Sequence, residues 1–190
     1  MNILIAGDSF SADWSVKYSD KIGWPNMLAA TYNVTNIAQA GVSEYKILKQ
    51  LQSVDLSTFD SVIVSHTSFS RVHTVRHPIF NNDKLHSNCD LIWSDVESKK
   101  DLNASYKAAW SYFRYHWDEN YYKDVYSLFR KEINLLLLDV SKVLQINNFN
   151  PLNSDISFKH LLPEFSGDIN HFNSEGNVII YKDVLNHLRS

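Results

Sequence analysis

Short apolar runs that alternate with helical patterns constrain the fold of this chain most strongly. The first run, Ile3 to Ala6, stops at Gly7-Asp8-Ser9, residues that favour a tight turn or a helix cap. A short, uninterrupted apolar run is typical of a strand buried on both faces. The pattern predicts further strands at residues 33–37 and 61–65, separated by helices at residues 25–31 and 44–53. This alternation predicts an α/β fold with a small parallel sheet and right-handed crossovers.

The segment after the third predicted strand is longer than a simple strand–helix connection needs. We expect residues 69–118 to form an insertion, partly as extended loop, within a single domain that spans residues 1–190. A helix predicted at residues 102–117 carries aromatic rings on two faces. The rings either pack over the sheet, or leave one face for a ligand or for a second copy of the chain in a homo-oligomer.

The last third of the chain has a helical pattern at both ends. Apolar residues at a spacing of three to four predict one long helix over residues 119–145, although residues 135–138 alone would also suit a strand. The pattern then predicts a break at residues 147–155 with Pro151, a short strand near residues 156–158, and a final helix that ends near residue 188. Asn173 or Ser174 is expected to cap that final helix.

Composition and charge exclude several classes of partner. The net charge of −3, without a cluster of Lys and Arg, argues against a nucleic-acid partner. The most apolar stretch, Ile133 to Val140, is far too short to span a membrane, and the N-terminus lacks the basic segment of a signal peptide. The single Cys89 cannot form an intramolecular disulfide, which agrees with a reducing compartment. We therefore expect a cytoplasmic protein.

The residues with the clearest chemical meaning lie at the two ends of the chain. Ser9 follows the first strand, at the edge where open α/β sheets bind ligands and where backbone N–H groups could hold an oxyanion. Serine is a poor nucleophile without a base, and His171 near the C-terminus offers one, with Asp168 three residues earlier. The alternative is that Ser9 is a turn or cap residue and that His171 is a bystander beside a helix cap.

Three segments in this order resemble the SGNH (GDSL-type) hydrolases. They are Gly7-Asp8-Ser9, then residues 36–43 with the pattern Asn-Ile-Ala-Gln-Ala-Gly-Val-Ser, and finally Asp168-Ile-Asn-His171. The resemblance implies a three-layer α/β/α, flavodoxin-like fold and acyl transfer through an ester on Ser9. It implies that His171 is the base, that Asp168 orients His171, and that the backbone N–H groups of Ser9 and Gly41 form the oxyanion hole.

The chain departs from this family at the end of the third strand. The family's third block is Gly-x-Asn-Asp, and here the sequence is Ser65-His-Thr-Ser68, with Thr67 in the asparagine position. Thr67, Ser68 or His66 could replace the asparagine as an oxyanion donor; otherwise the activity is weak or the chemistry has changed. A structural reading is that these residues only cap the strand. Arg71 could bind an anionic substrate group or pair with a carboxylate, and Asp8, His66, Ser68 and Arg71 form the candidate substrate-binding set.

Together these features predict an enzyme that acts on a small ester. The aromatic insertion and the small sheet favour an acetyl group on a carbohydrate-like substrate, so we expect a serine esterase. The alternatives are an O-acyltransferase in surface polysaccharide modification and a catalytically silent binding protein with this fold. We expect no cofactor and no metal, because the histidines between residues 66 and 86 lack a metal-ligand motif with tight spacing.

Overall fold

A four-stranded parallel sheet lies at the centre of the molecule. The computed structural model describes residues 1–18, 20–77, 84–97, 103–150 and 154–190. The strands are β1 (Asn2–Gly7), β2 (Asn33–Asn36), β3 (Ser61–His66) and β4 (Val143–Asn147), in the order β2-β1-β3-β4. All three neighbouring pairs are parallel. The predicted α/β class with a small parallel sheet is confirmed.

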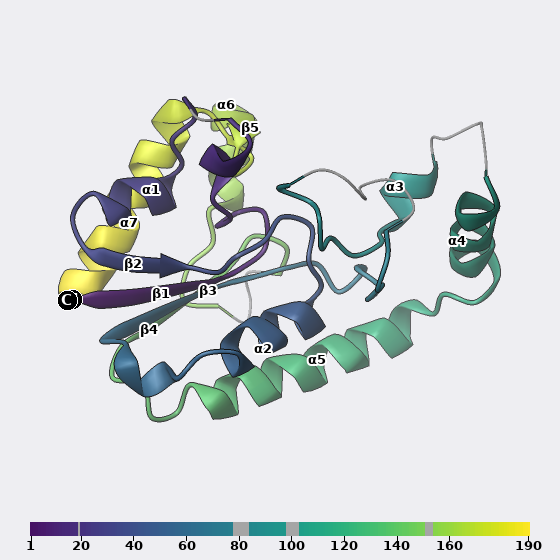
Figure 1. The fold of residues 1–190 in the computed structure, drawn as a ribbon, viewed down its shortest axis with the longest axis horizontal. Helices are drawn as coiled ribbons and strands as arrows, with labels where there is room; N and C mark the ends of the chain where they lie inside the picture. The colour runs from purple at the N-terminus through teal and green to yellow at the C-terminus, as the bar shows by residue number, and fades with distance from the viewer. Residues whose placement is uncertain (19, 78–83, 98–102, 151–153) are drawn as a thin grey trace.

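Helices cover both faces of this sheet (Figure 1). One face packs against α1 (Trp24–Ala29) and α7 (Ser174–Arg189), and the other against α2 (Glu44–Gln52) and α5 (Glu119–Leu136). Successive side chains of a strand point to opposite faces. Ile3 and Ile5 of β1 therefore enter the core beneath α1 and α7, whereas Leu4 and Ala6 enter the core beneath α2 and α5. The continuous apolar run of β1 thus supplies two cores, which gives the fold three layers.

Local signals explain where several elements begin. Pro25 occupies the first turn of α1, where its missing N–H costs no hydrogen bond. Asn173 caps α7, as predicted, by accepting a hydrogen bond from the Gly176 amide at 2.9 Å. The shorter elements are the 3₁₀ turns η1 (Trp14–Val16), η2 (Leu56–Thr58) and η4 (Lys159–Leu161), the helix α6 (Leu162–Phe165) and the strand β5 (Ser166–Ile169).

The segment between β3 and α5 lies beyond the carboxyl end of the sheet (Figure 1). It contains α3 (Trp93–Glu97) and α4 (Ala104–Tyr115), which share a small apolar cluster with the preceding Leu91; the helices contribute Val96, Tyr106 and Ala109. The helix predicted at residues 102–117 corresponds to α4; residue 102 lies outside the described residues. Instead of covering the sheet, this helix completes a small apolar cluster of its own.

The prediction of one helix over residues 119–145 is wrong beyond Leu136. The chain leaves α5 there and forms β4, whose Leu144 and Ile146 are buried. Their spacing of two is that of a strand, but in the sequence it merges with the helical spacing that precedes it. The strand predicted near residues 156–158 is reduced to an isolated bridge between Ile156 and Ile146. Pro151, in the predicted break, lies outside the described residues.

Candidate active site

The turn after β1 places Ser9 at the carboxyl end of the sheet. Gly7 has a φ of +148°, and a Cβ atom there would lie 2.5 Å from the carbonyl oxygen of Ser65. Only glycine fits this approach between two neighbouring strands. The Asp8 carbonyl accepts a hydrogen bond from the Ala12 amide at 3.0 Å, which closes the turn. The position of Ser9 is therefore fixed by the backbone around it.

The loop between β5 and α7 brings His171 to Ser9. The Ser9 Oγ atom lies 2.7 Å from His171 Nε2. The Asn170 side-chain amide donates hydrogen bonds to the carbonyls of Ser9 and Ala12, each at 3.0 Å. Asn170 and His171 both have positive φ values, +52° and +67°, a costly conformation for residues other than glycine. The hydrogen bonds of Asn170 offset this cost, and the two ends of the chain meet in one site.

The surroundings of His171 keep its ring neutral. The Phe10 ring lies against it, with 4.3 Å between ring centroids. Burial lowers the pKa of His171, and the charges of Arg71 and His86 lower it further, to about 4. The imidazole is then uncharged at neutral pH. Its Nε2 atom can accept the hydroxyl proton of Ser9, which is what a general base must do.

Asp168 does not take the orienting role that the sequence predicted. Its carboxylate, with 82% of the side chain exposed, pairs with Lys21 Nζ at 3.3 Å. Neighbouring residues of a strand point to opposite sides; in β5 Ile169 is buried, so Asp168 faces solvent. Among the described residues, the side chain of His171 has a hydrogen bond only with Ser9. The structure therefore presents a Ser9–His171 dyad.

Two backbone amides at the same edge of the sheet are unpaired. In the part of the chain that the structure describes, neither the Ser9 amide nor the Gly41 amide donates a hydrogen bond. Gly41 has a φ of +76°, and a Cβ atom there would lie 2.7 Å from the Cβ atom of Cys89. Glycine is thus required by both the conformation and the close packing. Unpaired N–H groups of this kind are what an oxyanion hole needs.

The hydroxyls of Thr67 and Ser68, at the end of β3, differ in their hydrogen bonds. Thr67 is fully buried, and its hydroxyl has no hydrogen-bond partner among the described residues. The hydroxyl of Ser68 is paired with that of Ser70 at 2.6 Å. The Thr67 hydroxyl is therefore unpaired within the described chain but, like the ring of His66, buried away from the protein surface.

The structure places His66 in the interior, which corrects its prediction as a substrate-binding residue. The ring is fully buried. Its Nδ1 atom lies 2.6 Å from Glu44 Oε1, and its Nε2 atom lies 3.0 Å from Gln145 Oε1. Both ring nitrogens are therefore used between α2, β3 and β4. The partners stand 22 and 79 residues away in the sequence, so no local pattern could have revealed them.

Asp8 is likewise a structural residue rather than part of a substrate-binding surface. It is 1% exposed, and its Oδ1 atom accepts hydrogen bonds from the Phe10 amide at 3.0 Å and from Ser65 Oγ at 3.2 Å. Its Oδ2 atom has no partner among the described residues. Burial raises the pKa of the Asp8 carboxyl to about 7. The side chain holds the turn that carries Ser9.

Arg71 joins the insertion to the loop that carries Gly41. Its Nη1 atom donates to the carbonyl oxygens of Gly41 and Asp90, at 3.1 and 3.2 Å. The buried carboxylate of Asp90 accepts a hydrogen bond from the Ser43 amide at 2.7 Å and pairs with Lys46 Nζ at 2.8 Å. Sequence reasoning missed Asp90, because these partners lie more than forty residues away in the chain. It is the residue that fastens the insertion over Gly41.

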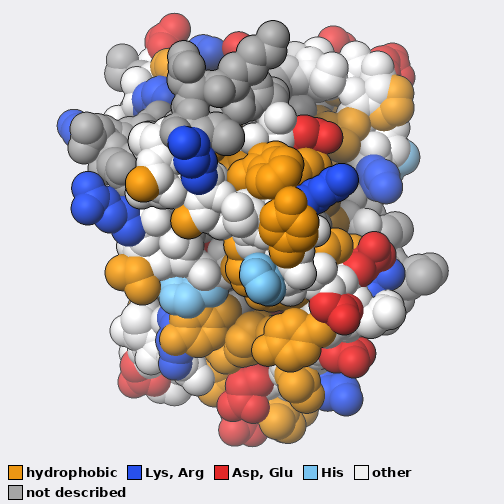
Figure 2. All heavy atoms as spheres, turned by 90° about the vertical axis from the view of Figure 1, so that its right-hand side faces the viewer, with side chains coloured by type: hydrophobic (Ala, Val, Ile, Leu, Met, Phe, Trp, Pro, Cys, Tyr) orange, Lys and Arg blue, Asp and Glu red, His pale blue; other side chains and the backbone are white. Residues whose placement is uncertain are grey.

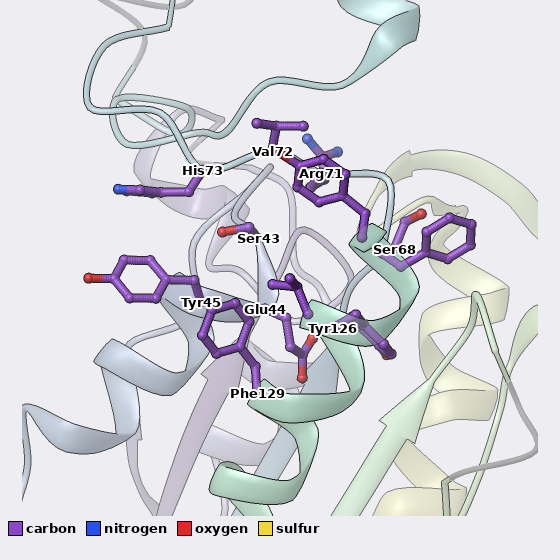
Figure 3. Close-up of a pocket in the computed structure, with 12 residues that line it drawn as sticks. Ser43, Glu44, Tyr45, Ser68, Arg71, Val72, His73, Tyr126 and Phe129 are labelled. Carbon is purple, nitrogen blue, oxygen red and sulfur yellow. The ribbon is translucent and has the colours of Figure 1, made fainter. Parts of the chain in front are cut away.

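A cavity of about 240 Å³ lies next to this loop (Figure 3). Arg71 and Ser43 form one side of it, and Tyr45, Tyr126 and Phe129 from α2 and α5 contribute aromatic walls. The Ser43 hydroxyl is buried without a described partner. The cavity thus combines apolar walls with a few polar groups, as small-molecule sites do.

Comparison with known proteins assigns no family to the chain. No protein-family model matches it, and no curated protein matches its sequence. Among the described residues, no group of three or more His, Cys, Asp or Glu side chains could hold a metal ion. None of the helices described is long and apolar enough to cross a membrane.

Proposed function

We propose that this chain is a serine esterase of the SGNH type, which transfers an acyl group through an ester on Ser9. The observation that carries the proposal is the 2.7 Å contact between Ser9 Oγ and His171 Nε2. With its pKa lowered to about 4 by burial, His171 is neutral at pH 7 and can accept a proton, although it is a weaker base than an ordinary histidine.

The first half of the reaction forms the acyl-enzyme. Ser9 Oγ attacks the ester carbonyl carbon as its proton passes to His171 Nε2, and the carbonyl oxygen becomes an oxyanion. The Ser9 and Gly41 amides would receive this oxyanion. His171 then gives the proton to the leaving alcohol oxygen as the carbon–oxygen bond breaks. The acyl group remains on Ser9.

The second half depends on the acceptor. Water activated by His171 would attack the acyl carbon, release the acid and return the proton to Ser9 Oγ, which is esterase chemistry. A sugar hydroxyl in the place of water would make the same acyl-enzyme an O-acyltransferase. Acetyl is the simplest acyl group for such a reaction; the cavity of about 240 Å³ is lined by neither Ser9 nor His171 and is not assigned to it.

One observation favours the alternative, a binding protein without catalysis. Asp168 faces solvent, so no described carboxylate stabilises the imidazolium that His171 becomes during the reaction. A dyad without this partner is a slower catalyst, and a silent site would look similar. Turnover therefore has to be measured.

Hydrolysis of p-nitrophenyl acetate tests the proposal. Ser9→Ala and His171→Ala should each lower kcat/KM by about 10³-fold or more, as expected when a nucleophile or its base is removed. Ser15→Ala is a matched control, because this hydroxyl lies a few residues further on, in η1, and bonds to Asp13. Its rate should stay at the wild-type level. Turnover retained in Ser9→Ala, with the far-UV circular dichroism unchanged, would remove Ser9 from the mechanism.

A further inference from the structure

The cavity of about 240 Å³ between α2, α5 and the turn after β3 has mostly apolar walls. One half-buried face of α5 lines it at a spacing of three to four residues, with Tyr122, Val125, Tyr126 and Phe129. The Tyr45 ring of α2 meets this face, with 5.5 Å between its centroid and that of Phe129. Figure 2 shows hydrophobic side chains gathered on the side of the molecule where α4 and the start of α5 lie. The helix α5 thus contributes apolar side chains to the cavity as well as to the surface.

The N-terminus of α2 adds hydrogen-bond donors to the same cavity. Ser43, which precedes α2, is 4% exposed and lines the cavity (Figure 3). Its hydroxyl neither caps the helix nor has another partner among the described residues. In the same part of the chain, the amides of Glu44, Tyr45 and Lys46 donate no hydrogen bond. A buried hydroxyl is costly without a partner, and a helix N-terminus attracts negative charge, so these donors suit the oxygens of an anion.

Arg71 brings a positive charge to the cavity. Its Nη1 atom donates to the carbonyl oxygens of Gly41 and Asp90, which are uncharged acceptors. Across the described residues, no carboxylate pairs with this guanidinium, and its Nε atom is buried without a partner. The sequence left two roles open for Arg71, and the described contacts favour the binding of an anion over a pair with a carboxylate.

The charges and the volume limit the ligand to a small anion. Glu44 also lines the cavity, and its carboxylate contacts His66 Nδ1 at 2.6 Å and accepts from the Thr67 amide at 3.3 Å. This negative charge would repel a dianion such as phosphate more strongly than a carboxylate. A cavity of about 150 Å³ already holds benzene, so about 240 Å³ is enough for one ring with a carboxylate and too small for a nucleotide or a long acyl chain.

We propose that this cavity binds a monocarboxylate that carries one aromatic ring. The carboxylate accepts hydrogen bonds from Arg71 Nε, from the Ser43 hydroxyl and from the first amides of α2. The ring lies among Tyr45, Tyr126 and Phe129, whose faces and edges favour edge-to-face contacts with another aromatic ring. The inference goes beyond the proposed esterase reaction, because binding at this cavity requires no chemistry.

An NMR titration with benzoate as the probe tests the proposal. A ligand of this size should bind with a dissociation constant of about 1 mM, and the amide signals of Glu44 to Lys46 should shift. Benzamide has the same ring without the charge and should bind at least about tenfold more weakly, since hydrogen bonds to a charged group are the stronger ones. Acetate, which lacks the ring, and inorganic phosphate should also bind more weakly than benzoate.

Two variants test the named donors. Ser43→Ala breaks no described hydrogen bond, so it should fold like the wild type and bind benzoate about tenfold more weakly. Its matched control is Ser53→Ala at the other end of α2, whose hydroxyl bonds to the Gln50 carbonyl outside the cavity. Arg71→Gln should weaken benzoate binding about tenfold or more. Its control is Arg76→Gln, an exposed residue outside the cavity. Both controls should bind like the wild type.

Several results would overturn the proposal. They are a folded wild type that does not bind benzoate, benzamide that binds as tightly as benzoate, phosphate that binds more tightly than benzoate, and unchanged binding in both Ser43→Ala and Arg71→Gln. The titration is independent of the esterase assay, because Ser9→Ala should bind benzoate like the wild type. An inactive protein that binds benzoate as described supports the site. An active protein without this binding overturns the site and leaves the proposed reaction standing.

Discussion

Replacing Asp8 by asparagine should make the stability of the protein less dependent on pH. Burial of the Asp8 carboxyl raises its pKa from 3.8 to about 7. The native state therefore holds this proton more tightly than the unfolded chain does. A group of this kind lowers the free energy of unfolding as the pH rises, from about the unfolded pKa through the native pKa. Ionised Asp8 thus destabilises the turn that it helps to build.

The size of the effect follows from the two pKa values. Since one pKa unit corresponds to about 1.4 kcal/mol, Asp8 should cost about 3 kcal/mol of stability between about pH 5 and pH 8.5. The asparagine in Asp8→Asn carries no charge, while its oxygen can still accept the hydrogen bonds of Phe10 and Ser65.

Urea unfolding at about pH 5 and about pH 8.5 gives the free energy of unfolding of wild type and of Asp8→Asn. Because the other titrating groups are the same in both proteins, their contributions cancel in the difference. Exposed Asp139 offers a matched control in Asp139→Asn, which should keep the wild-type pH dependence. If Asp8→Asn loses as much stability as the wild type between the two pH values, the carboxyl of Asp8 is already ionised in the native state below pH 5, and the reasoning is refuted.

Three further predictions concern the carboxyl edge of the sheet, where Ser9 and His171 meet. The pH profile of kcat/KM should have its acid limb near pH 4, the pKa of His171, and a midpoint near the ordinary histidine value of about 6.5 would contradict the neutral-ring assignment. Asp168→Asn should change kcat/KM less than about threefold, because the carboxylate pairs with Lys21; a loss of about 10⁴ would show that it orients His171 during turnover. Gly41→Ala should lower the free energy of unfolding by about 1–3 kcal/mol in urea titrations, because its Cβ atom would meet Cys89 at 2.7 Å; unchanged stability would show that the loop adapts.

The parts of the fold that the sequence predicted are those with clear boundaries. The run Ile3 to Ala6 is apolar at every position, too short for a helix, and closed by Gly7-Asp8-Ser9, which together indicate a strand with two buried faces. The strand β4 was missed because the apolar spacing of α5 continues into Val143 and Leu144, so that the helical and the strand period overlap. Neither glycine nor proline marks the change. What separates the two elements is burial, which only the assembled sheet reveals.

The residues of the candidate site were also predicted only in part. Ser9 and His171 could be paired from sequence, because each stands in a distinctive segment at its end of the chain. The orientation of Asp168 could not, because one residue of register in β5 decides whether it faces His171 or solvent. The buried partners of His66 come from α2 and β4, and no local pattern reports such a contact. Side chains that depend on long-range packing are therefore where the sequence alone falls short.

The reactivity of Ser9 is the most direct measure of the proposed chemistry. Incubation with a fluorophosphonate, followed by intact mass and peptide mapping, reports any serine that a neighbouring base activates. We expect a single adduct, on Ser9, which forms at least about a hundredfold more slowly in His171→Ala. A folded wild-type protein that acquires no adduct on Ser9 would contradict the dyad as a catalyst and would favour a binding protein.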